Sequence, residues 1–173
     1  MIKRSLILPV LILLLTSFSE PKYCKLSDRI LAQYVKELQR DEKLHLYGHG
    51  GSMMNDVKVV EIYLLGNQKL SVDEARELFV KISEELIARY NNSEKIRPFL
   101  HNYPFTINNI DVQLAFQDEN RRHQTDGNVA LVFIAKQSIC YCSYDRQKEC
   151  FLDLHSEPYE EGLAIVNNTI CKK

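Results

Sequence analysis

The chain has 173 residues, with 22 lysines and arginines against 23 aspartates and glutamates, a formal net charge of −1 and 45% apolar residues. This length suits one ordinary domain that folds around a single hydrophobic core. The near-neutral charge balance excludes three classes: a strongly basic nucleic-acid binder, a chain kept disordered by its charge, and a protein with several membrane spans.

The N-terminus has the pattern of a secretory signal peptide. Lys3 and Arg4 precede an apolar run over residues 6–15. Two small residues follow, Ser17 and Ser19, at the −3 and −1 positions of a cleavage site after Ser19. A helix that spans a bilayer takes about 20 apolar residues, so this run is too short to cross one comfortably.

This pattern predicts a signal peptide over residues 1–19 and one domain over residues 20–173. We therefore expect an exported protein of the periplasm, the envelope or the medium. Attachment to a membrane would come only through a signal that is not cleaved.

The first part of the exported domain predicts a helix, a loop and a strand. Apolar residues recur every three or four positions within residues 27–41, as on one face of a helix, at Ile30, Leu31, Tyr34, Val35 and Leu38. Residues 44–55 contain three of the six glycines and predict a flexible loop. Residues 56–65 are rich in β-branched side chains and predict a strand.

A second, longer helix begins after Ser71. Ser71 and Glu74 have the spacing of a capping box, in which each side chain binds a free backbone N–H of the first turn. Behind them runs an apolar stripe of Val72, Ala75, Leu78, Phe79, Ile82, Leu86 and Tyr90. The helix should end at Asn91 and Asn92.

The C-terminal half predicts three strands and a short helix. The strands are expected over residues 107–116, 129–144 and 149–154, and the helix from Pro158 to about Val166. Asp126 and Gly127 mark the turn between the first two of these strands.

Taken together, these elements predict an α+β domain. We expect one mostly antiparallel sheet of about four strands, with the helices packed on one of its faces.

All five cysteines lie in the exported domain, at Cys24, Cys140, Cys142, Cys150 and Cys171. In an oxidising compartment they would tend to pair. A hairpin through residues 144–147 would bring Cys150 opposite Cys140 or Cys142, and a bond between Cys24 and Cys171 would tie the two ends of the domain together. One cysteine is left over, and it could link two copies as a disulfide-bonded dimer.

The most unusual segment is the glycine-rich one around His45 and His49. Two histidines four residues apart could bind a metal on a helix, but the glycines disfavour a helix and the glutamate of a zinc-protease motif is absent. The segment also lacks the pattern of a phosphate-binding loop and precedes a strand instead of a helix. A small hydrolase or metal-dependent enzyme that uses His45 and His49 is therefore the alternative function, beside the simpler interpretation of a connecting loop.

A second candidate is the connection over residues 96–105, which two prolines stiffen. Its residues Arg97, Phe99, Tyr103 and Phe105 are of the types that anchor protein interfaces. They predict a partner-binding surface, or else aromatic side chains that pack against the sheet.

The run Ile-Arg-Pro-Phe-Leu-His-Asn-Tyr-Pro-Phe over residues 96–105 resembles a run in small exported proteins of unknown function from chlamydia-like intracellular bacteria. Those proteins carry a similar long helix before the run and strands after it. The resemblance covers about residues 57–145. It implies an exported α+β domain and supplies no activity and no functional residues.

The rest of the sequence shows only weak patterns for catalysis or cofactor binding. The chain shows no dinucleotide fingerprint and no serine-triad order, and we expect no cofactor and no nucleic-acid partner. Asp153, His155, Glu157 and Glu160 near the C-terminus could supply a carboxylate–histidine pair for general base chemistry, although four polar residues around a turn are usually surface. The main expectation is an exported, non-enzymatic domain that binds another macromolecule or associates with the envelope, with a protein partner whose identity the sequence does not give.

Overall fold

The structure is a computed structural model that describes residues 21–170, so the predicted signal peptide over residues 1–19 lies outside the described residues. Its elements in chain order are α2 (Lys22–Asp41), β1 (His45–Ser52), β2 (Val59–Gly66), α3 (Val72–Asn92), the 3-10 turns η1 (Arg97–Phe99) and η2 (Ile107–Asn109), β3 (Ile110–Phe116), β4 (Leu131–Ala135), β5 (Ser138–Asp145), β6 (Cys150–Pro158) and α4 (Tyr159–Ile170).

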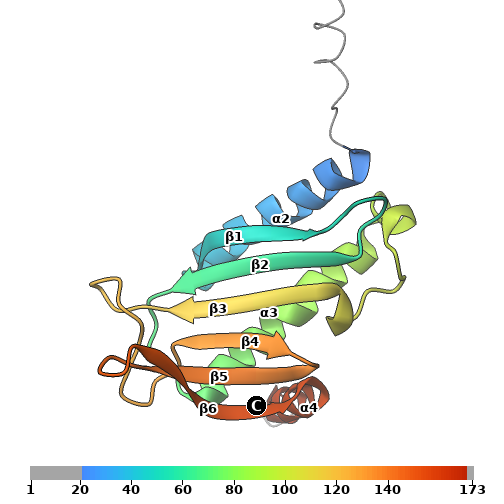
Figure 1. The fold of residues 1–173 in the computed structure, drawn as a ribbon. Coiled ribbons are helices and arrows are strands. Elements are labelled where there is room, and N and C mark those ends of the chain that lie inside the picture. The colour runs from blue at the N-terminus through green and yellow to red at the C-terminus, as the bar shows by residue number, and fades with distance from the viewer. Residues whose placement is uncertain (1–20, 171–173) are drawn as a thin grey trace, which may run out of the picture.

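The strands form one six-stranded sheet in the order β1-β2-β3-β4-β5-β6. Neighbouring strands are antiparallel except β2 and β3, which are parallel because α3 carries the chain back between them. The α+β class is confirmed, but the predicted number of about four strands is wrong: the mostly antiparallel sheet has six strands and is mixed, because it contains the parallel pair β2 and β3. Figure 1 shows α2 and α3 behind one face of this sheet and α4 beside its β6 end.

The segment predicted as a flexible loop, residues 44–55, contains strand β1. Gly48 pairs with Tyr63 and Gly50 pairs with Glu61 on β2. A Cβ atom at Gly48 would lie 3.1 Å from the Tyr63 ring, and one at Gly50 would lie 3.0 Å from the Glu61 carboxylate. These two glycines therefore leave room for the side chains of the next strand, and the strand does not need a flexible backbone there.

The predicted long strand over residues 129–144 is two strands joined by a tight turn. Lys136 and Gln137 form the turn with φ values of 50° and 65°. This conformation usually selects Asn or Gly, so the sequence carries no signal for it. The turn predicted at Asp126 and Gly127 is confirmed, with φ values of 60° and 77°.

The local sequence predicts the start of α3 correctly, but it misses the start of α2 and the end of α4. The capping box is present: the Glu74 carboxylate accepts from the Ser71 backbone N–H at 2.9 Å, and the Ser71 hydroxyl accepts from the Glu74 N–H at 3.4 Å. Helix α2 begins at Lys22, earlier than predicted, and α4 continues to Ile170, beyond the predicted end. No helix among residues 21–170 is long and apolar enough to cross a membrane.

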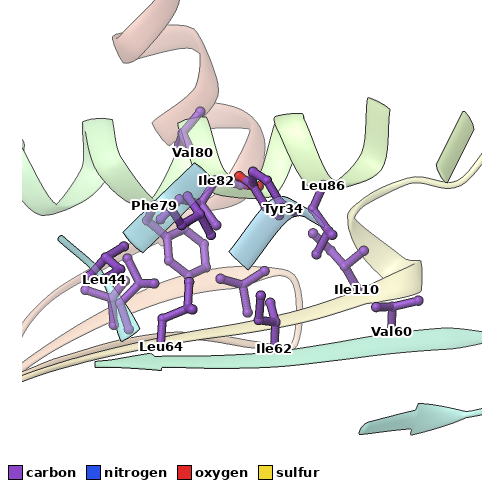
Figure 2. Close-up of a cluster of buried hydrophobic side chains, with 14 of the residues drawn as sticks. Tyr34, Leu44, Val60, Ile62, Leu64, Phe79, Val80, Ile82, Leu86 and Ile110 are labelled. Carbon is purple, nitrogen blue, oxygen red and sulfur yellow. The ribbon is translucent and has the colours of Figure 1, made fainter. Parts of the chain in front are cut away.

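The hydrophobic core lies between the sheet and the two long helices. Figure 2 shows Phe79 and Ile82 of α3 above Ile62 and Leu64 of β2, with Tyr34 of α2 beside them. The buried Tyr34 hydroxyl donates to the Ile82 carbonyl at 3.1 Å, which joins α2 to α3. This core fixes the positions of the loops at both ends of the sheet.

Candidate functional site

The connection between α3 and β3 lies beside the loop that joins β1 to β2, as the upper right of Figure 1 shows. The Val57 N–H donates to the Phe99 carbonyl at 2.8 Å, and the His101 N–H donates to the Val57 carbonyl at 2.9 Å. Val57 and Leu100 thereby form an isolated parallel bridge. Two loops that are far apart in the sequence thus form one hydrogen-bonded unit.

A histidine–carboxylate hydrogen bond adds a side-chain contact to this unit. His101 Nδ1 lies 2.7 Å from the Asp56 carboxylate. The sequence offers no acidic residue next to His101, and Asp56 comes from the opposite loop, so only the fold reveals the pair. It fixes the orientation of the imidazole and holds the connection to the β1–β2 loop.

Asn91, at the end of α3, holds the other side of the connection. Its side-chain oxygen accepts from the Phe105 N–H at 2.7 Å, and its side-chain nitrogen donates to the Phe105 carbonyl at 2.9 Å. Arg97 also donates to the Asn91 backbone carbonyl at 3.0 Å. The connection is therefore attached at both ends to regular structure.

The four predicted partner-binding residues separate into two groups. Tyr103 is 53% exposed, and the Arg97 guanidinium lies 5.1 Å from the centre of its ring. Phe99 is partly buried, with its ring 5.9 Å from that of Tyr23. Phe105, in contrast, is 2% exposed and stacks on Tyr90 in the core, so its side chain cannot contact a partner.

Met54 is a surface residue at this end of the molecule that sequence reasoning missed. It is 84% exposed, and its carbonyl accepts from the Tyr23 hydroxyl at 2.8 Å. Its position in a loop gives no periodic signal that could have identified it. We use the term connector surface for Met54, Arg97, Phe99 and Tyr103.

His45 and His49 do not come together. In the β1–β2 register His45 is opposite Leu65 and His49 is opposite Ile62, with a bulge at Tyr47 between them. Because side chains alternate along a strand and the bulge adds one residue, the two histidines lie on opposite faces of the sheet. One ion cannot bind both, and residues 21–170 contain no cluster of three metal-binding side chains.

The cysteines of the β5–β6 hairpin do not form the predicted bonds. The turn places Cys150 opposite Asp145 and therefore beyond the reach of Cys140 and Cys142, and all three thiols are free. Burial, together with a hydrogen bond to Asp153 at 3.6 Å, raises the pKa of the Cys142 thiol to about 11. Cys171, the predicted partner of Cys24, lies outside the described residues.

His155 and Glu157 do lie together, in a buried network at the β5–β6 edge. The Glu157 carboxylate is 3% exposed and accepts from Arg76 Nε at 2.7 Å and from the Tyr141 hydroxyl at 2.6 Å. His155 Nε2 lies 3.3 Å from its other oxygen. Burial alone would raise the pKa of Glu157, but the hydrogen bonds from Arg76 and Tyr141 outweigh burial and lower it.

This network has the character of a structural anchor. The arginine joins α3 to β6 through Glu157, and it also contacts Asp73 on its own helix. Oε1 of this carboxylate accepts from both Arg76 and Tyr141 and Oε2 lies beside His155, so these contacts hold the carboxylate in a fixed position within the fold. The connector surface remains the candidate binding site.

Comparisons of the chain with protein-family models, with curated proteins and with solved structures give no match.

Proposed function

We propose that this is an exported protein that binds another protein through the connector surface. The observation that carries the proposal is Tyr103, a half-exposed aromatic ring beside the Arg97 guanidinium on a connection that is fixed at both ends. Tyrosine and arginine are enriched among the residues that dominate binding energy at protein interfaces.

The rigidity of the connection supports this proposal. Binding loses free energy when it must order a flexible loop or side chain. Here the bridge at Val57, the hydrogen bond between His101 and Asp56 and the side chain of Asn91 hold the segment before any partner arrives. Phe99 and Met54 belong to the same end of the molecule, since the Phe99 ring lies 5.9 Å from that of Tyr23 and the Tyr23 hydroxyl donates to the Met54 carbonyl.

Export rests on the signal-peptide pattern of residues 1–19. Intact-mass measurement of the protein recovered outside the cytoplasm tests it. We expect the mass of residues 20–173, and a mass that retains residues 1–19 would contradict cleavage after Ser19.

Site-specific photo-crosslinking tests the binding surface. A photoreactive phenylalanine analogue replaces Tyr103 in one variant of the full-length chain and Tyr47 in a matched control, since Tyr47 is a 78% exposed tyrosine on β1. Both variants are irradiated in cells that make the protein. We expect a discrete covalent adduct from position 103 and none from position 47. Equal adducts from both positions, or none from position 103, would contradict the proposal.

A further inference from the structure

One face of the sheet carries no helix among residues 21–170 (Figure 1). The strand register aligns its side chains in rows that cross all six strands. The first row is His45, Leu65, Ala115, Leu131, Cys142 and Asp153. The second row is Gly48, Tyr63, Gln113, Phe133, Cys140 and Ser156. We call the face of the sheet that carries these two rows the open face.

The part of the open face that β4 and β5 form is apolar, although the uncovered face of a sheet is usually polar. Leu131 and Phe133 lie on β4, and Cys140 and Cys142 lie beside them on β5. The ends of the first row are polar and complementary, since the imidazole of His45 can donate a hydrogen bond and the side chain of Asp153 can accept one. An apolar centre with complementary ends is typical of a surface that another protein covers.

We propose that two copies of this chain pack their open faces together about a two-fold axis parallel to the strands. This operation reverses the strand order, so β1 of one protomer lies over β6 of its partner. His45 then faces the partner's Asp153, and Tyr63 faces the partner's Cys140. The carboxylates of Glu61 and Asp111 face small residues on β4 and β5 of the partner. No carboxylate of one protomer therefore faces a carboxylate of the other in this row.

The dimensions of the sheet agree with such an interface. With about 4.8 Å between strands and about 3.3 Å per residue, the face measures about 24 Å by 25 Å. That is about 600 Å² per copy and about 1,200 Å² for the pair, which reaches the lower limit of specific interfaces. Two twisted sheets pack in this way at about 10 Å separation and about 30° between strand directions.

The edges of the sheet are poor alternatives for pairing. Both outer strands carry a bulge, at Tyr47 in β1 and at Leu154 in β6. A bulge interrupts the row of free backbone groups that a further strand would need. Two copies would therefore meet through the face more readily than through an edge.

The mass of the exported domain in solution, measured by analytical ultracentrifugation over a concentration series, tests the association. We expect a dimer for the wild type and a monomer for Phe133→Glu, which places a charge at the centre of the face. Ile165→Glu, on the exposed side of α4, is the matched control and should remain a dimer. A wild-type monomer at all concentrations, or no response to Phe133→Glu, would overturn the proposal.

Charge exchange tests the face without relying on a central substitution that could unfold the domain. His45→Asp should weaken the dimer about tenfold by facing the partner's Asp153 with a second carboxylate. Adding Asp153→His to His45→Asp should restore the affinity, because the pair is then exchanged. No recovery in the double variant would overturn the proposed axis.

Cysteine crosslinking tests the same axis by position. On mild oxidation, Tyr63→Cys should link the new thiol of one protomer to the partner's Cys140, and mass spectrometry locates the bond. In the wild type, a bond between Cys140 of one protomer and the partner's Cys140 would require the axis to run across the strands and would overturn this arrangement. If the chain does not dimerise, the proposal for the connector surface still stands, because none of the residues of that surface belongs to the open face.

Discussion

The molecule places an arginine beside a tyrosine ring in two different regions. In the network at the β5–β6 edge, Arg76 lies 5.9 Å from the centre of the Tyr141 ring, and both residues are buried. At the connector surface, Arg97 lies 5.1 Å from the centre of the Tyr103 ring, which is half exposed. Both pairs consist of an arginine and a tyrosine, but the first pair is buried and the ring of the second is half exposed.

The buried pair comes with a carboxylate and the exposed pair does not. Glu157 balances the charge of Arg76, whereas no carboxylate of residues 21–170 forms an ion pair with Arg97. A buried charge needs such a partner. Arg97 is only half-buried and donates to the Asn91 backbone carbonyl, beside the half-exposed Tyr103 ring. We therefore propose a stabilising role for the buried pair and a binding role for the pair at the connector surface, and substitutions can separate the two roles.

The largest expected effect is on the buried pair. Arg76→Met leaves the Glu157 carboxylate buried without its main charged partner, so we expect a loss of about 3–5 kcal/mol in the free energy of unfolding. Urea denaturation measures this loss. Arg76→Met combined with Glu157→Gln should recover part of it, and equal losses in the single and double variants would contradict the role of the pair.

Removing single hydroxyl groups sharpens the comparison. Tyr141→Phe deletes the O–H that donates to Glu157 and should lower the free energy of unfolding by about 1–3 kcal/mol. Tyr103→Phe should change it by less than about 0.5 kcal/mol, because that hydroxyl is at the surface. The same urea titration compares them, and similar losses would contradict the distinction.

The pH dependence of stability reports on Glu157 separately. The pKa of Glu157 is lowered in the folded state, so its ionised carboxylate stabilises the fold. This stabilisation is fully present above the pKa of the unfolded state, about 4.3, and is lost as the pH falls through the pKa of the folded state. The stability difference between wild type and Glu157→Gln should therefore be largest at neutral pH and shrink below about pH 4. Glu77→Gln, an exposed position on α3, is the control and should show no such trend.

One substitution on the open face should raise the free energy of unfolding slightly instead of lowering it. Asp111 lies beside Glu61 on the neighbouring strand, and burial together with this like charge raises the pKa of Asp111. A raised carboxyl pKa means that ionisation destabilises the fold. Asp111→Asn should therefore add about 0.2–1 kcal/mol at pH 7, measured by urea denaturation, and the gain should disappear on acidification.

Local patterns predicted the elements whose signals are local. The capping box of Ser71 and the turn at Asp126 depend on neighbouring residues, and both are confirmed. Strand β1 was missed because its glycines are explained by the side chains of Tyr63 and Glu61 on another strand. The turn at Lys136 was missed because its residues are atypical of a tight hairpin.

The candidate site shows the same division. The composition of residues 96–105 indicated Tyr103 and Arg97, because aromatic and arginine side chains in a stiff connection are visible in sequence. The burial of Phe105 and the contact between His101 and Asp56 depend on how distant segments meet. Met54 joins the surface for the same reason, since the fold alone brings its loop beside the connection.

The central claim is that the connector surface binds a partner while the buried network stabilises the domain. Its most direct test measures two quantities, the free energy of unfolding and the yield of the partner adduct formed through a photoreactive group at Phe99, in two variants. We predict that Tyr103→Ala abolishes the adduct and leaves stability within about 0.5 kcal/mol of wild type. Tyr141→Phe should lower stability and retain the adduct. A Tyr103→Ala variant that keeps its adduct, or loses it only together with its stability, would contradict the account.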